Sequence, residues 1–497
     1  MRDYALVHVN GVRHEVRGRE ALMMLADWLR REAGLTGTKT VCSEGDCGSC
    51  TVLRAMPQPG CTTDFLEAPP LEFEAVNSCI ATVAQMDGSH IVTVEGMQCG
   101  AELSPAQEAM KTCHASQCGY CTPGFVMAMS AMLERHNGIA QPIGPQLAAN
   151  YLTGNLCRCT GYVTILEAAL AVKATKQHSV ARRYSNPAAV QAGIAAAEQS
   201  LLIEHDGVCV CAPVTVREAC SFAATHPGFR VLGAATDLGV QINKGKPLPR
   251  AILSLHLIPD LYEMKQTRNR WRVGARVSLA TIRRMCEESS PELSRFLNLF
   301  ASPQIKNVAT LVGNVANASP IGDTLPFLLI SDGQVHVASR PGGKGPLRQR
   351  TIAMTDLYTG YKTLALEPGE IITHVSFANP EAKEMVRLSK VSMRKDLDIS
   401  AVSAAFSCTL QKRGRSRKPP VIESARIAYG GVAATPIRLP EIEEALEGEV
   451  TAEKIESLAN RIADRVKPLS DVRGSAAYRR VLAANLFRRF GAEVLLA

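Results

Sequence analysis

The residues best suited to chemistry are the cysteines of a short loop, Cys42-Ser-Glu-Gly-Asp-Cys47-Gly-Ser-Cys50, together with Cys79 further along the chain. A C-x4-C-x2-C spacing followed by a distant cysteine is the ligand pattern of a two-iron two-sulfur (2Fe–2S) cluster. Gly45 and Gly48 permit turns with positive φ and let backbone N–H groups approach the sulfurs. The alternatives are buried structural cysteines or a zinc site. The spacing and the interleaved glycines favour the iron cluster, and with it electron transfer.

A second set of cysteines lies in a stretch whose apolar residues repeat at helical spacing. It consists of Cys118-Gly-Tyr-Cys121 and Cys157-Arg-Cys159. We expect each pair to lie at a helix terminus, where nearby glycines free the backbone and N–H groups favour an anionic cluster. A four-cysteine zinc site is the main alternative. A C-x-C half is unusual for zinc, so we interpret this set as a second 2Fe–2S centre.

Length and composition set broad limits on the protein. The 497 residues suggest about three domains. No apolar run is long enough for a transmembrane helix, and the alternating N-terminus, Met1-Arg-Asp-Tyr-Ala-Leu-Val-His-Val, is typical of a strand rather than a signal peptide. We therefore expect a cytoplasmic protein without a membrane partner. In that compartment the sixteen cysteines are better suited to metal binding than to disulfides.

The charge distribution gives little support for nucleic-acid binding. The net charge of +8 is modest, and the densest basic run is Lys412-Arg-Gly-Arg-Ser-Arg-Lys418. It lies between two strand-like segments and is followed by Pro419 and Pro420. We interpret it as a solvated hairpin tip. The alternatives are a surface that binds a nucleic acid or one that faces an acidic partner subunit.

The elements that must position the first cysteine loop form a small domain ending near residue 95. Segments 4–9 and 12–17 alternate around Asn10-Gly11, which predicts a hairpin. Leu22, Leu25 and Leu29 predict a helix ending near Gly34, and short strands are expected at 50–54 and 91–94. A hairpin, a helix, the cysteine loop and returning strands indicate a β-grasp-like arrangement.

The rest of the chain divides by its patterns into further domains. Residues 96–175 are expected to be helical, with helices beginning at Pro105 and Pro123, and 176–200 to be a linker. Residues 201–383 indicate an α/β domain. Residues 384–497 suggest an α+β lid with strands at 402–409 and 421–429 and helices at 439–446 and 451–466. The predicted fold class is α+β multidomain.

Two small-residue segments in the α/β domain suggest a bound cofactor. Residues 231–239 read as a strand running into a Gly/Thr/Asp turn, the chemistry of a pyrophosphate cradle. This is not the G-x-G-x-x-G fingerprint. Residues 310–314 and 318–323 give a second segment that can contribute to the same ligand site.

These motifs together resemble a known family. The cysteine segments 114–124 and 154–162, with the loops after 230 and 300, resemble the molybdenum hydroxylases. The chain looks like their iron–sulfur and FAD-binding small subunit, as found in bacterial xanthine dehydrogenases. The resemblance implies a β-grasp, ferredoxin-like 2Fe–2S domain (1–95), a helical-bundle 2Fe–2S domain (96–175), an α/β FAD-binding domain (201–383) and a C-terminal flavoprotein subdomain (384–497).

In this family, electrons from purine hydroxylation at a molybdopterin cofactor in a large partner subunit pass through both clusters to FAD and then to NAD. The resemblance implies that the helical-domain cluster is held by Cys118, Cys121, Cys157 and Cys159, and the ferredoxin-like one by Cys42, Cys47, Cys50 and Cys79. It implies a heterotetramer of two small and two large subunits. Gln117 matches a residue that contacts the pterin, and Asp398 matches an acidic loop near the flavin ring and the NAD site.

The positions that match FAD contacts in the family fall in several segments. They are Val231, Leu232, Gly233, Ala234, Ala235, Thr236, Asp237, Leu238, Phe300, Thr310, Leu311, Val312, Gly313, Asn314, Asp323, Ile372 and Lys390.

The sequence departs from the family pattern at three places. Family members more often have Gly at positions 234 and 312, and here Ala234 and Val312 each add a Cβ where backbone is expected to approach phosphate. After the second cysteine set, Val163 and Thr164 replace the more usual Arg-Pro.

Other functions fit parts of the pattern. The same relay can serve a hydroxylase acting on an aldehyde or an N-heterocycle, because substrate contacts would lie in the partner. A redox sensor or stand-alone electron carrier is a second class, and it predicts function without a large subunit. Oxygen or a quinone can replace NAD as acceptor.

Overall fold

The computed structural model describes residues 1–57, 71–136, 142–173, 176–394, 397–411 and 419–496. The basic run predicted to be a hairpin tip therefore lies outside the described residues. The chain divides into two compact units. Unit 1 contains Met1–Asp260, Ser302–Ala309 and Gly342–Lys344, and unit 2 contains Leu261–Ala301, Thr310–Pro341 and Gly345–Ala497.

Unit 1 begins with a five-stranded sheet in the order β2-β1-β5-β3-β4. Its strands are β1 (Tyr4–Val9), β2 (Val12–Arg17), β3 (Thr51–Ala55), β4 (Glu74–Asn77) and β5 (His90–Val92). The predicted hairpin is confirmed, since β1 and β2 pair from Tyr4↔Arg17 to Val9↔Val12. Asn10 and Gly11 have φ values of 50° and 85°, as a two-residue turn of this kind requires. Strand β4 was not predicted.

The single helix predicted around Leu22, Leu25 and Leu29 is wrong. The structure has two helices, α1 (Gly18–Leu22) and α2 (Leu25–Arg31), separated by Met23 and Met24 in extended conformation. Met24 forms an isolated antiparallel bridge with Thr82, and the N–H of Val83 donates to the carbonyl of Met23. Pairing with the segment after Cys79 therefore overrides the helical periodicity at this point.

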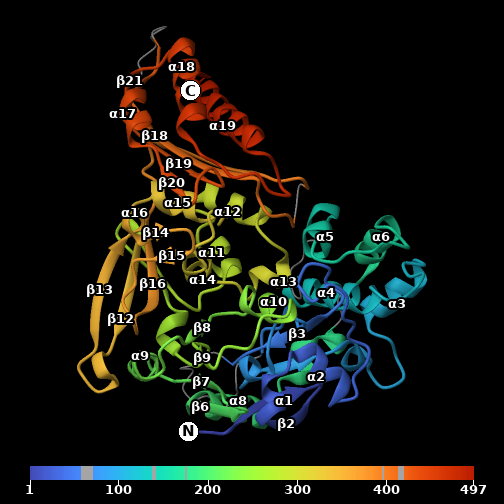
Figure 1. The fold of residues 1–497 in the computed structure, drawn as a ribbon. Helices are drawn as coiled ribbons and strands as arrows, with labels where there is room; N and C mark the ends of the chain where they lie inside the picture. The colour runs from blue at the N-terminus through green and yellow to red at the C-terminus, as the bar shows by residue number, and fades with distance from the viewer. Residues whose placement is uncertain (58–70, 137–141, 174–175, 395–396, 412–418, 497) are drawn as a thin grey trace. The chain divides into compact units, whose positions relative to one another are not determined.

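The helical segment of unit 1 follows the prediction closely. Its helices are α3 (Pro105–Thr112), α4 (Thr122–His136), α5 (Pro145–Leu152) and α6 (Val163–Ala171). Ser104 caps α3 with a reciprocal bond to Gln107, and Phe125, Met129 and Met132 of α4 are fully buried. In Figure 1 these helices lie beside the blue N-terminal sheet within the same unit.

The stretch predicted as a linker, 176–200, is not an extended connection. It contains η3 (Lys176–His178), α7 (Val180–Tyr184) and α8 (Pro187–Ala197). Asn186 caps α8 ahead of Pro187, and Val190 and Ile194 pack in the same core as α4. These buried apolar groups outweigh the alanine-rich composition on which the linker prediction was based.

A four-stranded sheet in the order β6-β7-β9-β8 completes unit 1. Its elements are β6 (Leu201–His205), β7 (Val208–Ala212), α9 (Val216–Thr225), β8 (Arg230–Leu232), α10 (Leu238–Asn243) and β9 (Ala251–Ser254), with α13 (Pro303–Lys306) added from further along the chain. The short helix η4 (Pro259–Tyr262) contains the point where the chain passes from unit 1 to unit 2. Strands β7, β9 and β8 are parallel. The predicted strand at Val231 is confirmed.

Unit 2 contains two five-stranded sheets and a short hairpin. The first sheet, β10-β11-β16-β12-β13, is formed by β10 (Met264–Thr267), β11 (Arg270–Gly274), β12 (Gln334–Ser339), β13 (Arg348–Ala353) and β16 (Ile371–Ala378). The hairpin is β14 (Tyr358–Gly360) with β15 (Thr363–Leu364). The helices of this part are α11 (Leu279–Met285), α12 (Pro291–Leu299), α14 (Leu311–Ala316), α15 (Leu325–Ile330) and α16 (Met354–Leu357).

The C-terminal part of unit 2 is an antiparallel sheet covered by helices, as predicted. Its strands are β17 (Glu384–Val391), β18 (Val402–Leu410), β19 (Val421–Gly430), β20 (Ile437–Arg438) and β21 (Gly448–Glu449), and its helices are α17 (Pro440–Leu446), α18 (Ala452–Arg465) and α19 (Ala476–Leu496). In Figure 1, α18 and α19 lie against β18 and β19, and Phe406, Tyr429 and Phe487 meet in the core between them. The long helix α19 was not predicted.

Among the described residues, no helix combines the length and apolar character needed to cross a membrane. The described cysteines are all free thiols.

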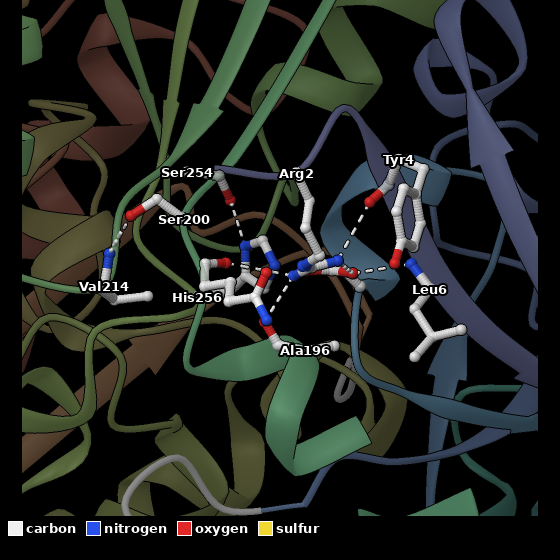
Figure 2. A network of polar contacts seen from close by, with 10 residues as sticks. Arg2, Tyr4, Leu6, Ala196, Ser200, Val214, Ser254 and His256 are labelled. Carbon is white, nitrogen blue, oxygen red and sulfur yellow. Dashed lines mark hydrogen bonds and ion pairs between the residues drawn. The ribbon is translucent and has the colours of Figure 1, made fainter. Parts of the chain in front are cut away.

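A buried ion pair lies at the N-terminus of unit 1, where the chain also meets the second sheet of this unit. Arg2 bonds Asp87 through two nitrogens at 2.9 and 2.7 Å, and neither side chain is appreciably exposed. Figure 2 shows Arg2 reaching the carbonyls of Tyr4 and Ala196. The backbone of Arg2 also forms an isolated parallel bridge with Leu201, the first residue of β6. Asp87 also accepts the N–H of Leu6 at 2.8 Å. Burial raises the pKa of Asp87, although hydrogen bonds from Arg2 oppose that shift.

We expect Asp87→Ala to lower the free energy of unfolding by about 3 to 5 kcal/mol, because it leaves the Arg2 guanidinium buried without its counter-ion. Urea unfolding followed by circular dichroism measures the change. Glu15→Ala is the matched control, since Glu15 pairs with Arg13 and Arg17 on an exposed strand and should cost less than about 1 kcal/mol. Equal effects of the two substitutions would contradict this role for the buried pair.

Candidate functional site

The first cysteine loop connects α2 to β3 and folds back on itself. Gly45 and Gly48 have φ values of 76° and 69°, so both use the backbone freedom that the sequence analysis required of them. The Sγ atom of Cys42 accepts the N–H groups of Glu44 and Cys47, each at 3.4 Å. Donors of this kind stabilise a thiolate and the cluster that it binds.

The four thiols predicted to hold the first cluster converge. The thiol of Cys42 contacts those of Cys47 and Cys79, and Cys79 also contacts Cys50. Hydrogen bonds from Cys47 and Cys79 hold the pKa of Cys42 well below its usual range. The contacts of Cys79 with Cys42 and with Cys50, and its burial, all raise the pKa of Cys79. Four thiols that converge in this way fit a 2Fe–2S cluster, which binds them as thiolates.

The second set lies before two helices, as predicted. Cys118 and Cys121 precede α4, and Cys157 and Cys159 precede α6. The sulfurs of Cys159 and Cys118 are 3.4 Å apart. Burial, together with the Cys157 thiol, raises the pKa of Cys121 to about 12.

The second set is therefore grouped as two pairs of sulfurs, Cys118 with Cys159 and Cys121 with Cys157. Pairs suit a binuclear cluster, in which each iron takes two thiolates. Cys118 and Cys159 are exposed, so this site lies at the surface of the chain.

The two cysteine loops touch through their backbones. The N–H of Leu156, next to Cys157, donates to the carbonyl of Cys47 at 3.0 Å. Beside this bond, Asn155 Nδ2 donates to the carbonyl of Gly48 at 3.0 Å. A Cβ added at Gly48 would clash with the carbonyl oxygen of Gly154. One peptide hydrogen bond thus connects a ligand candidate of one cluster to the neighbour of a ligand candidate of the other.

A buried glutamine secures this junction. Gln304, which is 0% exposed, donates to Asn155 Oδ1 at 2.8 Å and to Thr51 Oγ1 at 3.3 Å. Sequence reasoning missed Gln304 and Asn155. Gly48 was recognised as a site of backbone freedom, but only its close approach to the carbonyl of Gly154 shows why it lacks a side chain. Gly154 lacks one because a Cβ there would clash with Gln304 Oε1. Gln304 is more than 140 residues from Asn155, and no local pattern signals their contact.

The first predicted flavin segment, 231–238, lies in unit 1 between β8 and α10. Ala235 has a φ of 59°, the left-handed region that favours glycine, which costs about 1 to 2 kcal/mol for a residue with a Cβ. Backbone strain of this kind is common in ligand-binding turns. The carbonyl of Ala235 accepts the N–H of Gly239 at 2.7 Å, and the side chain of Asp237 accepts a bond from Gln241.

The other flavin candidates lie in unit 2. Residues 310–314 form the start of α14, where Thr310 Oγ1 accepts the N–H of Gly313 at 2.9 Å, so this segment is a helix terminus rather than a loop. Val312 is only 5% exposed, so its added side chain packs into the core. Thr324 Oγ1 donates to Asn314 Oδ1 at 2.7 Å.

A buried ion pair lies near the start of the C-terminal sheet. Lys390 donates to Asp323 at 2.6 Å, and Ser400 bonds both. Ile372 is buried in β16, and Phe300 follows α12 in a half-buried position. Each of these positions belongs to unit 2, and the 231–238 segment belongs to unit 1.

The two candidates for contacts with other molecules differ in their surroundings. Gln117 is exposed directly before Cys118. Asp398 accepts the N–H groups of Arg394 and Ile399 at 2.9 and 3.0 Å, so its carboxylate holds its own loop together. Ile399 and Met393 on this loop are 50% and 80% exposed.

Comparison with protein families finds four matching domains in the order predicted. Residues 7–84 match a 2Fe-2S iron-sulfur cluster binding domain, and 93–170 match a [2Fe-2S] binding domain. Residues 205–380 match the FAD binding domain in molybdopterin dehydrogenase, and 387–494 match the CO dehydrogenase flavoprotein C-terminal domain. The chain therefore contains two iron–sulfur domains and a flavin domain.

Relatives and solved structures agree with these domains. Xanthine dehydrogenase of Drosophila subobscura is 30% identical over 93% of this chain, and that of Oryza sativa subsp. japonica is 29% identical over 90%. The chain spans only 37% and 36% of their lengths. The fold is similar to chains of a Cu,Mo-CO dehydrogenase (TM-score 0.51, 22% identity, 57% of this chain and 96% of that one) and of quinoline 2-oxidoreductase from Pseudomonas putida 86 (0.51, 23%, 57% and 95%).

We expect each set of cysteines to be required for one cluster only. Cys42→Ala and Cys118→Ala should each remove one of two electron paramagnetic resonance (EPR) signals and lower iron from about four to about two per chain, since each cluster needs all four thiolates. Cys113→Ala is the control, because Cys113 ends α3 and has no ligand spacing. Retention of full iron in both ligand variants would rule out these assignments.

Proposed function

Because this chain belongs to the molybdenum hydroxylases as their iron–sulfur and flavin-binding, electron-transferring part, we propose that it is the small subunit of a xanthine dehydrogenase. In this proposal, a partner subunit oxidises hypoxanthine or xanthine at a molybdopterin cofactor, and this chain passes the electrons through two clusters to FAD and then to NAD. The observation that carries the proposal is the Leu156–Cys47 hydrogen bond, which brings the two cysteine loops into contact within unit 1.

We assign the cofactors to the residues described above. Cys42, Cys47, Cys50 and Cys79 would hold one cluster, and Cys118, Cys121, Cys157 and Cys159 the other. The segments 231–238 and 310–314, with Phe300, Asp323, Ile372 and Lys390, would bind FAD. The flavin, when bound, exchanges electron pairs with NAD and single electrons with the clusters. The protein's own contribution is to orient these groups, and Asp398 stabilises the loop proposed to lie on the NAD side.

The domain boundaries near residues 95 and 383 belong to the same proposal, as does a cytoplasmic location. The free thiols of the described cysteines suit a reducing compartment.

The proposed partner has a suitable surface to bind. Around the exposed thiols of Cys118 and Cys159, unit 1 presents large apolar side chains to solvent. They are Tyr120 (48% exposed), Leu156 (36%), Tyr162 (46%) and Val163 (71%). Apolar and aromatic groups gathered in this way are typical of a protein interface. Gln117 lies in the same region and would contact the pterin, and the expected assembly is two small and two large subunits.

The substrate depends on the partner, where the substrate contacts are expected to lie. Xanthine dehydrogenase is the name of the relatives that match over most of this chain, which supports purines. Turnover of hypoxanthine, compared with aldehydes and nicotinate, by the reconstituted complex separates the purine hydroxylase from the alternatives. If the chain is active alone, as a monomer, this would instead favour a stand-alone electron carrier.

We expect NADH to reduce the isolated chain under anaerobic conditions, because the residues proposed for FAD, NAD and both clusters all lie in it. Flavin absorbance should bleach first and cluster absorbance should follow, as measured by stopped-flow spectroscopy. Dithionite provides the control, since it reduces the centres without using the NAD site. Reduction by dithionite but not by NADH would exclude NAD as the acceptor.

We expect Val163→Asp to weaken the complex with the large subunit by at least tenfold while both cluster signals and the NADH reaction remain. A charge at the 71% exposed Val163 should disturb an apolar interface, whereas an acidic residue in the first turn of α6 is compatible with the helix. Size-exclusion chromatography and titration of the complex measure the effect. Val12→Asp, at a 59% exposed position on β2, is the control, and equal binding of the two variants would place the interface elsewhere.

A further inference from the structure

The helix that follows the first flavin segment ends on the first cysteine loop. Asn243, the last residue of α10, donates from Nδ2 to the carbonyl of Ser43 at 2.8 Å and to the carbonyl of Cys79 at 2.8 Å. Ser43 is adjacent to Cys42, and Cys79 is itself a ligand candidate. One amide group therefore uses both of its hydrogens on the backbone that carries two of the four thiols.

The packing of α10 brings Asn243 to this position. Gly239 lies against the carbonyl of Ile80, where an added Cβ would clash with that oxygen. Val240 packs on the buried group formed by Ala26, Cys50, Cys79 and Ile80. The helix thus runs along the segment that contains Cys79, and its first residue, Leu238, directly follows the predicted pyrophosphate turn.

The conformation of Ser43 shows that its carbonyl must be held in place. Its φ of 56° lies in the left-handed region, which is unfavourable for a residue with a side chain. A strained peptide of this kind persists only where its surroundings fix it. The hydrogen bond from Asn243 fixes the carbonyl end of Ser43, and the nearby ion pair of Lys244 with Glu44 (2.9 Å) is largely exposed to solvent and contributes less.

The same amide has an electrostatic effect. Its hydrogens, the positive end of the N–H dipoles, point toward the backbone around Cys42 and Cys79. Reduction adds negative charge to a 2Fe–2S cluster, and nearby hydrogen bonds are among the factors that set its potential. Removing the donor should therefore make reduction less favourable.

We propose that Asn243 is a positioning residue for the electron relay: it fixes the ferredoxin-like cluster loop to the helix that begins at the flavin segment, and it raises the reduction potential of that cluster alone. This inference rests on the proposed assignment of Cys42, Cys47, Cys50 and Cys79 as ligands. Within the described part of the chain, the side-chain hydrogen bonds of Asn243 go to Ser43 and Cys79, and none goes to the second set of cysteines. The helical-domain cluster is therefore an internal reference in the same molecule.

The test is a redox titration of the full chain followed by EPR, which separates the two cluster signals. Asn243→Leu keeps the side-chain size and removes both donors. The expected result is a lower midpoint potential and altered g-values for the ferredoxin-like cluster, with no change in the helical-domain cluster. Asn243→Asp, which has the same shape and places a carboxylate against the two carbonyls, should lower the same potential further.

Controls separate this effect from loss of structure. Lys244→Met removes the neighbouring ion pair, whose charges are screened by solvent, and should shift the ferredoxin-like potential less than Asn243→Leu does. Asn243→Gln keeps an amide donor and should restore part of the potential. Unchanged potentials in both Asn243→Leu and Asn243→Asp would overturn the inference, as would equal shifts of the two clusters, which a general loosening of the fold would produce.

The outcome can be distinguished from failure of the proposed function. A wild-type chain that contains both clusters but is not reduced by NADH would contradict the proposed acceptor and leave the role of Asn243 supported by the titration. A chain reduced by NADH whose ferredoxin-like potential does not respond to Asn243 would contradict only the positioning role.

Discussion

The contact between two peptide backbones at Gly48 and Gly154 is the constraint on which the rest of unit 1 depends. A Cβ at Gly48 would clash with the carbonyl oxygen of Gly154, so the cysteine loops could not approach and the bond from the N–H of Leu156 to the carbonyl of Cys47 would be lost. A Cβ at Gly154 would instead clash with the side chain of Gln304. The network of Gln304, Asn155 and Gly48 fills the space beside this contact with hydrogen bonds between buried amides. Such a network is stable only when its members are paired, so it holds the two loops in one arrangement.

The chain also uses its flavin domain to hold the first cysteine loop. Asn243 at the end of α10 and Gln304 in α13 come from segments about 60 residues apart, yet both belong to unit 1 with the loop that they contact. Asn307, just after α13, donates to the carbonyl of Ala75 in β4, close in sequence to Cys79. The position of this loop is therefore determined by side chains of a domain other than its own, through neutral amide hydrogen bonds that do not depend on pH.

Sequence alone predicted the features whose causes are local. The hairpin at Asn10-Gly11, the helices beginning at Pro105 and Pro123, and the strands of the C-terminal sheet follow from turn residues and apolar periodicity. The cysteine spacings anticipated two iron–sulfur domains, and the family matches confirm both. The ligand assignments of individual residues rest on these spacings and on the observed convergence of the thiols.

The failures have a common physical origin in long-range contacts. Met24 leaves the helical pattern because it pairs with Thr82, and 187–197 fold as a helix because Val190 and Ile194 are covered by residues far away in the chain. Asn155, Asn243 and Gln304 are ordinary amides in the sequence, and only their partners give them a role. We expected the side chain of Val312 to disturb a phosphate site, but in the structure this side chain is buried.

The most direct test of the complete relay is the number of electrons that one chain accepts. An anaerobic reductive titration of the purified full-length chain, followed by absorbance and EPR, gives this number. Two binuclear clusters that take one electron each and one FAD that takes two predict about four electrons per chain. Uptake of about two electrons, with either the flavin or both cluster signals absent, would contradict the claim that this chain alone carries the path from the partner to NAD.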